Sequence, residues 1–289
     1  MTDSKVTLTE KAVLVHFTTK SLGSTRIDKN ISEEVEEKYK AETPGRYFKR
    51  LFRREDIKPI WTAVNKSKNL CYRYSLPWFD GNVRVMPVGL LEKFLVENGK
   101  IMKEYETAVN AFIEDYDNIL DINKRRLNNL FNKDDYPTKD QAKESFAIRI
   151  GYMPLPDRED FRIAAPEEIV NQMKKKYDSN VKESEARAKS EVADRIYDTV
   201  QRLLDKLSKE DKPLRETAFS RIEPLVKNLR ILNITEDAKI ETVLKTMEKN
   251  FASEKADIIN ENASLRKQKK DEAKAVLEKV ETLRRSLVF

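Results

Sequence analysis

The sequence contains a single cysteine, Cys71, and a single histidine, His16. One cysteine cannot form a disulfide within the chain, and metal sites built from several thiol or imidazole groups are excluded. His16 follows the β-branched run AVLV and is predicted to be a structural residue of a buried strand rather than a catalytic base. Cys71, in NLCYRY, is predicted to be a small buried apolar side chain rather than a nucleophile. This cysteine content fits a reducing, cytoplasmic location.

Glycine is also scarce, with 6 in 289 residues. The chain has no glycine-rich phosphate loop, no H-E-x-x-H pattern and no G-x-S-x-G turn. Three carboxylates cluster in LPDREDF at Asp157, Glu159 and Asp160, and such a loop could bind a divalent cation. Satisfying the exposed amides of a turn is the favoured interpretation. We therefore predict a protein without enzymatic activity, cofactor or metal.

Long apolar runs are absent as well. No window of about 18 uncharged apolar residues occurs, and the first residues, MTDSKVTLTEKAVLV, lack the basic start and apolar stretch of a secretion signal. The sequence therefore predicts a soluble protein of the cytoplasm that has no membrane partner.

Charge is what the sequence has in abundance. Asp, Glu, Lys and Arg make up 37% of the residues, whereas about 25% is typical of globular domains. Many charges with few glycines favour long exposed helices, because such helices have much surface and few tight turns. We expect a mainly α, elongated protein.

A spaced apolar seam supports this fold class. Its residues alternate in steps of four and three, at Leu91, Leu95, Asn98, Met102, Tyr105, Val109, Phe112, Tyr116 and Ile119. A helix of about 40 residues is expected here. From Pro166 a second helical pattern runs through Ile169, Met173, Tyr177, Val181, Ala188, Val192, Ile196, Val200, Leu203 and Leu207. The two helices are predicted to form a long antiparallel coiled-coil hairpin with a small α/β cap, although two separately packed helices are the alternative.

Three regions follow from these patterns. Residues 1–89 are expected to be an α+β region that begins with the strand at AVLV and includes a loop or a short hairpin at SLPWFDGNVRVMP. Residues 90–208 are expected to be the helical hairpin, with its cap at about 132–165 and a capping box at Thr138 and Gln141. Residues 209–289 are expected to be a C-terminal helical region. Its last helix carries a short heptad at Ala273, Val276, Val280, Leu283 and Leu287, which needs a partner surface such as another copy of the chain.

Positive charge is concentrated in one place. Between Arg46 and Tyr74, nine Lys or Arg face two acids, so this stretch carries +7 while the whole chain carries +6. Thr43-Pro44 predicts a helix through RYFKRLFRR, with Tyr47, Phe48, Leu51 and Phe52 on its core side. The cations are candidates for contacts with nucleic-acid phosphates or with an acidic protein surface. They are Arg46, Lys49, Arg50, Arg53, Arg54, Lys58, Lys66, Lys68 and Arg73.

Several pieces of the chain resemble a known family. The order GRYFKRLF, CYRYSLPWFDGNVRVMP, DDYP, MPLPDREDFR and LRILNIT is similar to the family catalogued as domain of unknown function 3150. The resemblance covers most of residues 10–236 and carries no catalytic signature. It implies a bacterial, phage or mobile-element origin and genes encoded near MoxR-like or cobalt-chelatase-like AAA+ ATPases.

Two functions are predicted from these observations. The first is a non-enzymatic helical scaffold or adaptor that self-associates and works with a AAA+ ATPase, which rests on the seams and on the resemblance. The second is a DNA- or RNA-binding protein of replication or recombination that uses the basic stretch at 46–73.

Overall fold

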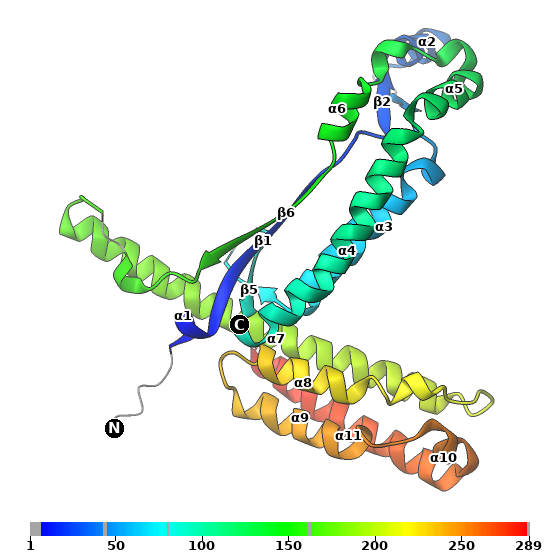
Figure 1. Cartoon of the computed structure of the whole chain (residues 1–289). Coiled ribbons are helices and arrows are strands. Elements are labelled where there is room, and N and C mark those ends of the chain that lie inside the picture. The colour runs from blue at the N-terminus through cyan, green and yellow to red at the C-terminus, as the bar shows by residue number, and fades with distance from the viewer. Residues whose placement is uncertain (1–6, 43–44, 80, 161–162, 288–289) are drawn as a thin grey trace. The chain divides into compact units, whose positions relative to one another are not determined.

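The computed structural model describes residues 7–42, 45–79, 81–160 and 163–287. It is mainly helical with a small sheet region, which confirms the mainly helical class predicted from the sequence. The chain forms two compact units (Figure 1). Unit 1 consists of Met1–His16, Cys71–Phe94 and Gly151–Phe289, and unit 2 consists of Phe17–Leu70 and Leu95–Ile150. Each unit combines segments that are far apart in the sequence, whereas the three predicted regions are consecutive segments. The division into three regions therefore stays a prediction.

A four-stranded sheet has the strand order β4-β5-β1-β6, and the residues of β1 and β6 are divided between the two units. The strands are β1 (Ala12–Lys20), β4 (Leu76–Pro77), β5 (Val83–Pro87) and β6 (Ala147–Pro154), and a short helix α1 (Leu8–Lys11) precedes β1. β1 pairs with β5 in antiparallel register, with Val13 opposite Met86. The predicted strand at AVLV and the hairpin at SLPWFDGNVRVMP are therefore confirmed. Asp80 of that hairpin lies outside the described residues, and Gly81 supplies the positive φ of 79° that a tight turn favours.

The helices of unit 1 pack around one long helix. They are α7 (Glu167–Ser208), η4 (Glu216–Ala218), α8 (Ile222–Leu232), α9 (Ala238–Phe251), α10 (Ala256–Glu261) and α11 (Ala263–Leu287), and the short η3 (Arg158–Asp160) precedes them. The second predicted seam is buried from Ala188 to Leu207. Ile169 and Met173, placed on the same seam, are exposed instead. The buried stripe of α7 packs mainly against α11, so the predicted antiparallel hairpin with residues 91–130 is not confirmed.

The apolar residues of the C-terminal heptad pack against other helices of the same chain. Ala273, Val276, Val280 and Leu283 are buried, and α11 packs against α7 and α9. The heptad ends at Leu287, and the two residues after it lie outside the described part of the chain. This apolar face needs no second copy of the protein, because α7 and α9 already cover it.

Unit 2 combines helices with a two-stranded ribbon. Its elements are β2 (Thr25–Asp28), α2 (Lys29–Tyr39), β3 (Tyr47–Arg50), α3 (Arg54–Arg73), α4 (Val88–Glu114), α5 (Tyr116–Leu127), η1 (Asn128–Leu130), η2 (Lys133–Asp135) and α6 (Lys139–Glu144), of which α3 and α4 continue into unit 1. α3 and α4 run side by side (Figure 1). The predicted 40-residue helix is interrupted at Asp115, between α4 and α5. The predicted capping box of Thr138 and Gln141 opens α6 and is confirmed.

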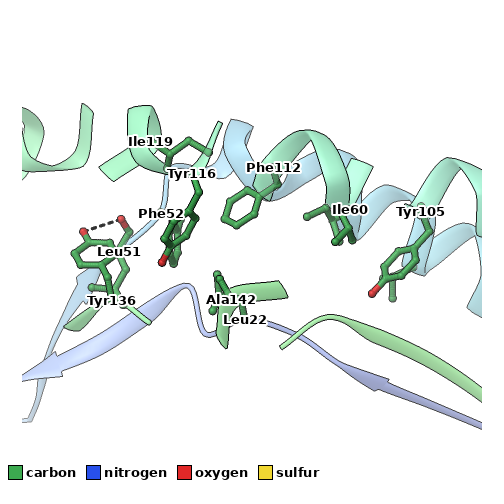
Figure 2. Packing of buried hydrophobic residues seen from close by; sticks show 13 residues of the cluster. Leu22, Leu51, Phe52, Ile60, Tyr105, Phe112, Tyr116, Ile119, Tyr136 and Ala142 are labelled. Atoms are coloured by element: carbon green, nitrogen blue, oxygen red, sulfur yellow. Dashed lines mark hydrogen bonds between the residues drawn. The ribbon is translucent and has the colours of Figure 1, made fainter. Parts of the chain in front are cut away.

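Aromatic rings fill the core of unit 2. Figure 2 shows Phe52 among Phe112, Tyr116 and Tyr136. The ring centroids of Phe52 and Tyr136 lie 5.4 Å apart in edge contact, and the Tyr136 hydroxyl donates a 3.1 Å hydrogen bond to the Leu51 carbonyl. The first predicted seam is thus buried from Tyr105 to Ile119, but residues of α3 and the chain before it cover it. Leu51 and Phe52, which directly follow β3, belong to this core and connect the strand to it.

Candidate nucleic-acid interface

The basic stretch RYFKRLFRR forms a strand where a helix was predicted. Residues Tyr47–Arg50 are β3, which pairs antiparallel with β2, and the helix α3 begins only at Arg54. The proposed helix start at Thr43-Pro44 lies outside the described residues. Lys and Arg are good helix formers, but here the pairing of Phe48 with Ile27 across the ribbon decides the conformation.

The pleat of β3 separates its side chains into two faces, because successive residues of a strand point to opposite sides. Lys49 lies on the inner face and is 5% exposed. Its Nζ lies 2.6 Å from Asp135 Oδ2 and 3.0 Å from Asp28 Oδ2, and it donates a 2.9 Å hydrogen bond to the Leu130 carbonyl. Lys49 therefore joins the ribbon to η1 and η2, so this predicted contact residue is used within the fold.

The charges of this inner cluster are mutually stabilised. Burial lowers the pKa of Lys49, but hydrogen bonds with Asp135 and Asp28 outweigh burial and leave the pKa raised. The hydrogen bond from Lys49 is the main reason why the pKa of Asp28 is lowered. Stabilisation by Asp28 is thus present above its ordinary pKa and is lost as the pH falls through the lowered value. Stabilisation by Lys49 is present below its ordinary pKa and is lost as the pH rises through the raised one.

We expect the inner cluster to give the protein an acid-sensitive component of stability. The free energy of unfolding should decrease as the pH falls below about 3.9, the ordinary pKa of Asp. Urea unfolding at several pH values, compared with the variant Asp28→Asn, measures this component, since asparagine caps α2 about as well as aspartate does. The gap in stability between the two proteins should narrow toward low pH. A gap that stays constant would contradict this role of Asp28.

The outer face of the ribbon presents an aromatic ring and cations. Phe48 is 59% exposed, and Ile27, its partner across the ribbon, is 36% exposed. Arg50 lies two residues along on the same face, and Arg46 directly precedes the strand; both are exposed. The four residues Arg46, Phe48, Arg50 and Ile27 are called the ribbon face below. The expectation that Phe48 and Tyr47 are core residues is wrong, whereas Leu51 and Phe52 are buried as predicted.

Two further predicted cations follow at the start of α3. Arg54 and Lys58 are exposed. Within the described residues neither of these side chains, nor those of Arg46 and Arg50, makes an ion pair. These four cations are therefore available to an external anion.

The other predicted cations are used differently. Arg53 forms an ion pair with Asp56, with 2.6 Å between Nη2 and Oδ1, and Lys66 forms one of 2.6 Å with Glu104. Lys68 is exposed on α3, and Arg73 is exposed but belongs to unit 1. The structure thus brings together only part of the predicted set.

One cation of this site was missed by the sequence analysis. Arg126 of α5 donates hydrogen bonds of 2.7 Å to the Arg50 carbonyl and 3.3 Å to the Leu51 carbonyl. It follows Lys124 and Arg125, and all three are exposed in the last turn of α5. The triplet KRR was visible in the sequence, but nothing local shows that a helix end 76 residues away lies against β3.

Comparison with known proteins adds nothing to this geometry. No protein-family model, curated protein or solved structure matches the chain. The resemblance to the domain of unknown function 3150 therefore stays a prediction, and the argument for the ribbon face rests on its own residues.

Two other predictions concern unit 1 and the chain as a whole. The carboxylates of LPDREDF form a turn, in which the Asp157 amide donates to Asp160 and the Glu159 amide donates to Asp157, as the favoured interpretation expected. Phe161, at the end of that motif, lies outside the described residues. Across the described ranges, no group of three or more His, Cys, Asp or Glu is placed to hold a metal ion. None of the helices in those ranges is long and apolar enough to cross a membrane.

Proposed function

We propose that this chain is a nucleic-acid-binding protein whose ribbon face contacts single strands. The observation that carries the proposal is the exposed ring of Phe48 beside two arginines that have no ion pair among the described residues. An exposed phenyl ring costs free energy in water, and Phe48 stays 59% exposed although it pairs with Ile27 across the ribbon.

The chemistry of the face matches a single-stranded ligand. Proteins that bind single strands combine a positively charged surface along the backbone with aromatic rings on which bases stack. Arginine suits the phosphates, since its planar guanidinium forms two parallel hydrogen bonds with an oxyanion. Stacking on Phe48 requires an unpaired base, which favours single strands over a duplex. Because phosphate contacts carry most of the affinity, binding should be strongly salt-dependent.

Phe48→Ala is the variant that tests the stacking contact. We expect it to weaken binding of a fluorescein-labelled single-stranded DNA by roughly 5- to 150-fold, corresponding to about 1–3 kcal/mol for one stacked base. Fluorescence anisotropy at several salt concentrations measures the affinity. The slope of log affinity against log salt should stay unchanged, because no phosphate contact is removed.

The matched control is Trp61→Ala, which removes an aromatic side chain of α3 from a residue that is 37% exposed. This control should leave the affinity within about twofold of wild type, because it lies outside the ribbon face. Equal losses in both variants would assign the effect to altered stability. Wild-type protein that binds neither DNA nor RNA at low salt would overturn the proposed function.

The scaffold function remains a prediction that rests on the apolar seams and on the family resemblance. Self-association was expected from the C-terminal heptad, and this heptad packs against α7 and α9 of the same chain. No described surface favours a AAA+ ATPase as partner over any other protein. The ribbon face gives the nucleic-acid function the stronger physical argument.

A further inference from the structure

A groove lies beside the ribbon face. It has a volume of about 620 Å³ and is lined by Ile27, Lys29, Ser32, Glu33, Glu36, Gly45 and Arg46. Ile27 and Arg46 belong both to this groove and to the ribbon face, so the two surfaces are continuous. The volume lies within the range of about 300–1,000 Å³ that is usual for sites of small ligands.

One wall of the groove is a face of α2. Residues 29, 32, 33 and 36 are spaced by three and four positions, which places them on the same side of a helix. Ser32 fixes this wall to the ribbon, because its hydroxyl donates a 2.7 Å hydrogen bond to the Asp28 carbonyl and accepts a 3.0 Å bond from the Tyr47 amide. The wall is thus held in place by the residues that connect it to both strands.

Gly45 lines another part of the groove. Its φ of 119° is a conformation that favours glycine, and apart from its two chain neighbours no heavy atom lies within 4 Å of where a Cβ would stand. Gly45 therefore adds no side chain to the groove.

The charges of the groove differ from those of the ribbon face. Glu33 is exposed and Glu36 is half-buried. Neither forms an ion pair with a described residue. Ionised carboxylates accept hydrogen bonds and cannot donate them, and they repel phosphate. A ligand that donates hydrogen bonds therefore fits this groove better than a phosphate group does.

We infer that the groove holds one base of the bound strand and prefers a base with an exocyclic amino group. This inference rests on the proposed function. A carboxylate accepts a hydrogen bond from the amino group of cytosine, whereas thymine presents a carbonyl oxygen at that position. Ile27 offers an apolar surface to the ring, and Arg46 and Lys29 neutralise the phosphate of the same nucleotide.

Two labelled oligonucleotides of equal length, oligo-dC and oligo-dT, separate the alternatives. Mildly alkaline buffer keeps cytosine neutral. We expect the wild-type protein to bind oligo-dC about 10-fold more tightly, since one good base contact discriminates by about 5- to 150-fold. The double variant Glu33→Gln/Glu36→Gln should lose this preference and bind oligo-dT more tightly than wild type does, because two repelling charges are gone.

The control is Glu34→Gln/Glu37→Gln, which makes the same change in charge on exposed residues of α2 that do not line the groove. It should keep the preference for oligo-dC. Equal wild-type binding of both oligonucleotides, a preference for oligo-dT, or equal effects of both double variants would overturn the inference and leave the proposed function intact. Absence of binding to either oligonucleotide would overturn the proposed function itself.

Discussion

Replacing Lys49 with methionine is expected to lower the free energy of unfolding by about 3–5 kcal/mol, because removing one partner of a buried ion pair leaves uncompensated charge behind. Lys49 is 5% exposed and forms ion pairs with two carboxylates, those of Asp28 and Asp135, whose side chains are 14% and 11% exposed. Methionine keeps the length of the apolar stem, so the loss reports the charge. Urea unfolding followed by circular dichroism measures it.

The matched control is Lys58→Met, which removes an exposed lysine of α3 and should change stability by no more than about 0.5 kcal/mol. A second variant tests the cause directly. In Lys49→Met/Asp28→Asn/Asp135→Asn the buried carboxylates are neutral as well, so the triple variant should be more stable than Lys49→Met alone. A triple variant that is no more stable would show that Lys49 acts through packing and not through charge.

The Lys49 result would also correct a functional assignment. The sequence places Lys49 among the candidate phosphate contacts, because it lies in a run of cations. In the structure it connects the ribbon to Asp135, which is 86 residues further along the chain. Local charge density predicts where an electric field is strong, but it does not tell which cations the protein uses internally.

Much of the fold follows from local patterns. The β-branched run at Ala12–Val15, the hairpin around Gly81 and the capping box of Thr138 each depend on residues close in sequence, and the structure contains all three. The buried stripe of α7 from Ala188 onward is also visible from its spacing. These features are predictable because short-range sterics and the helical period determine them.

What covers each apolar stripe could not be predicted. Periodicity identifies the buried side of α4 and α11, but the surfaces that cover them come from distant segments. Residues around Phe52 and Ile60 cover the stripe of α4, and α7 covers the stripe of α11. The same limitation explains the error at β3, because a strand of four residues is stabilised by its pairing with Thr25–Asp28 and not by its own sequence.

The same error of secondary structure explains why the exposure of Phe48 was not predicted. A helix would place Phe48 and Phe52 on one side, four residues apart, and both would be buried. In the strand, Phe48 points away from the core, and Phe52, beyond the end of the strand, enters it. One change of secondary structure therefore turns a core residue into a candidate contact for a base.

Reversing the charge of the free arginines is expected to have the largest effect on binding. Arg46→Glu/Arg50→Glu/Arg54→Glu should weaken binding of single-stranded DNA by at least ~100-fold at low salt, since it removes three phosphate contacts and adds repulsion. The slope of log affinity against log salt should fall by about 2, because each contact to a single strand contributes roughly 0.7. Arg53 is left unchanged, since its ion pair with Asp56 belongs to the fold.

The control distinguishes the ribbon face from the net charge of the protein. Lys100→Glu/Lys103→Glu/Lys143→Glu alters three exposed lysines of α4 and α6 and lowers the net charge from +6 by the same amount. If the ribbon face binds the strand, the arginine variant should bind more weakly and show the smaller slope of log affinity against log salt, whereas the lysine variant should keep the wild-type slope. Equal losses would mean that the strand responds to the overall field of a basic protein. Phe48→Ala added to the lysine variant tests the ring separately, because Phe48 carries no charge. A further loss of affinity in this variant would show that the ring itself contacts a base.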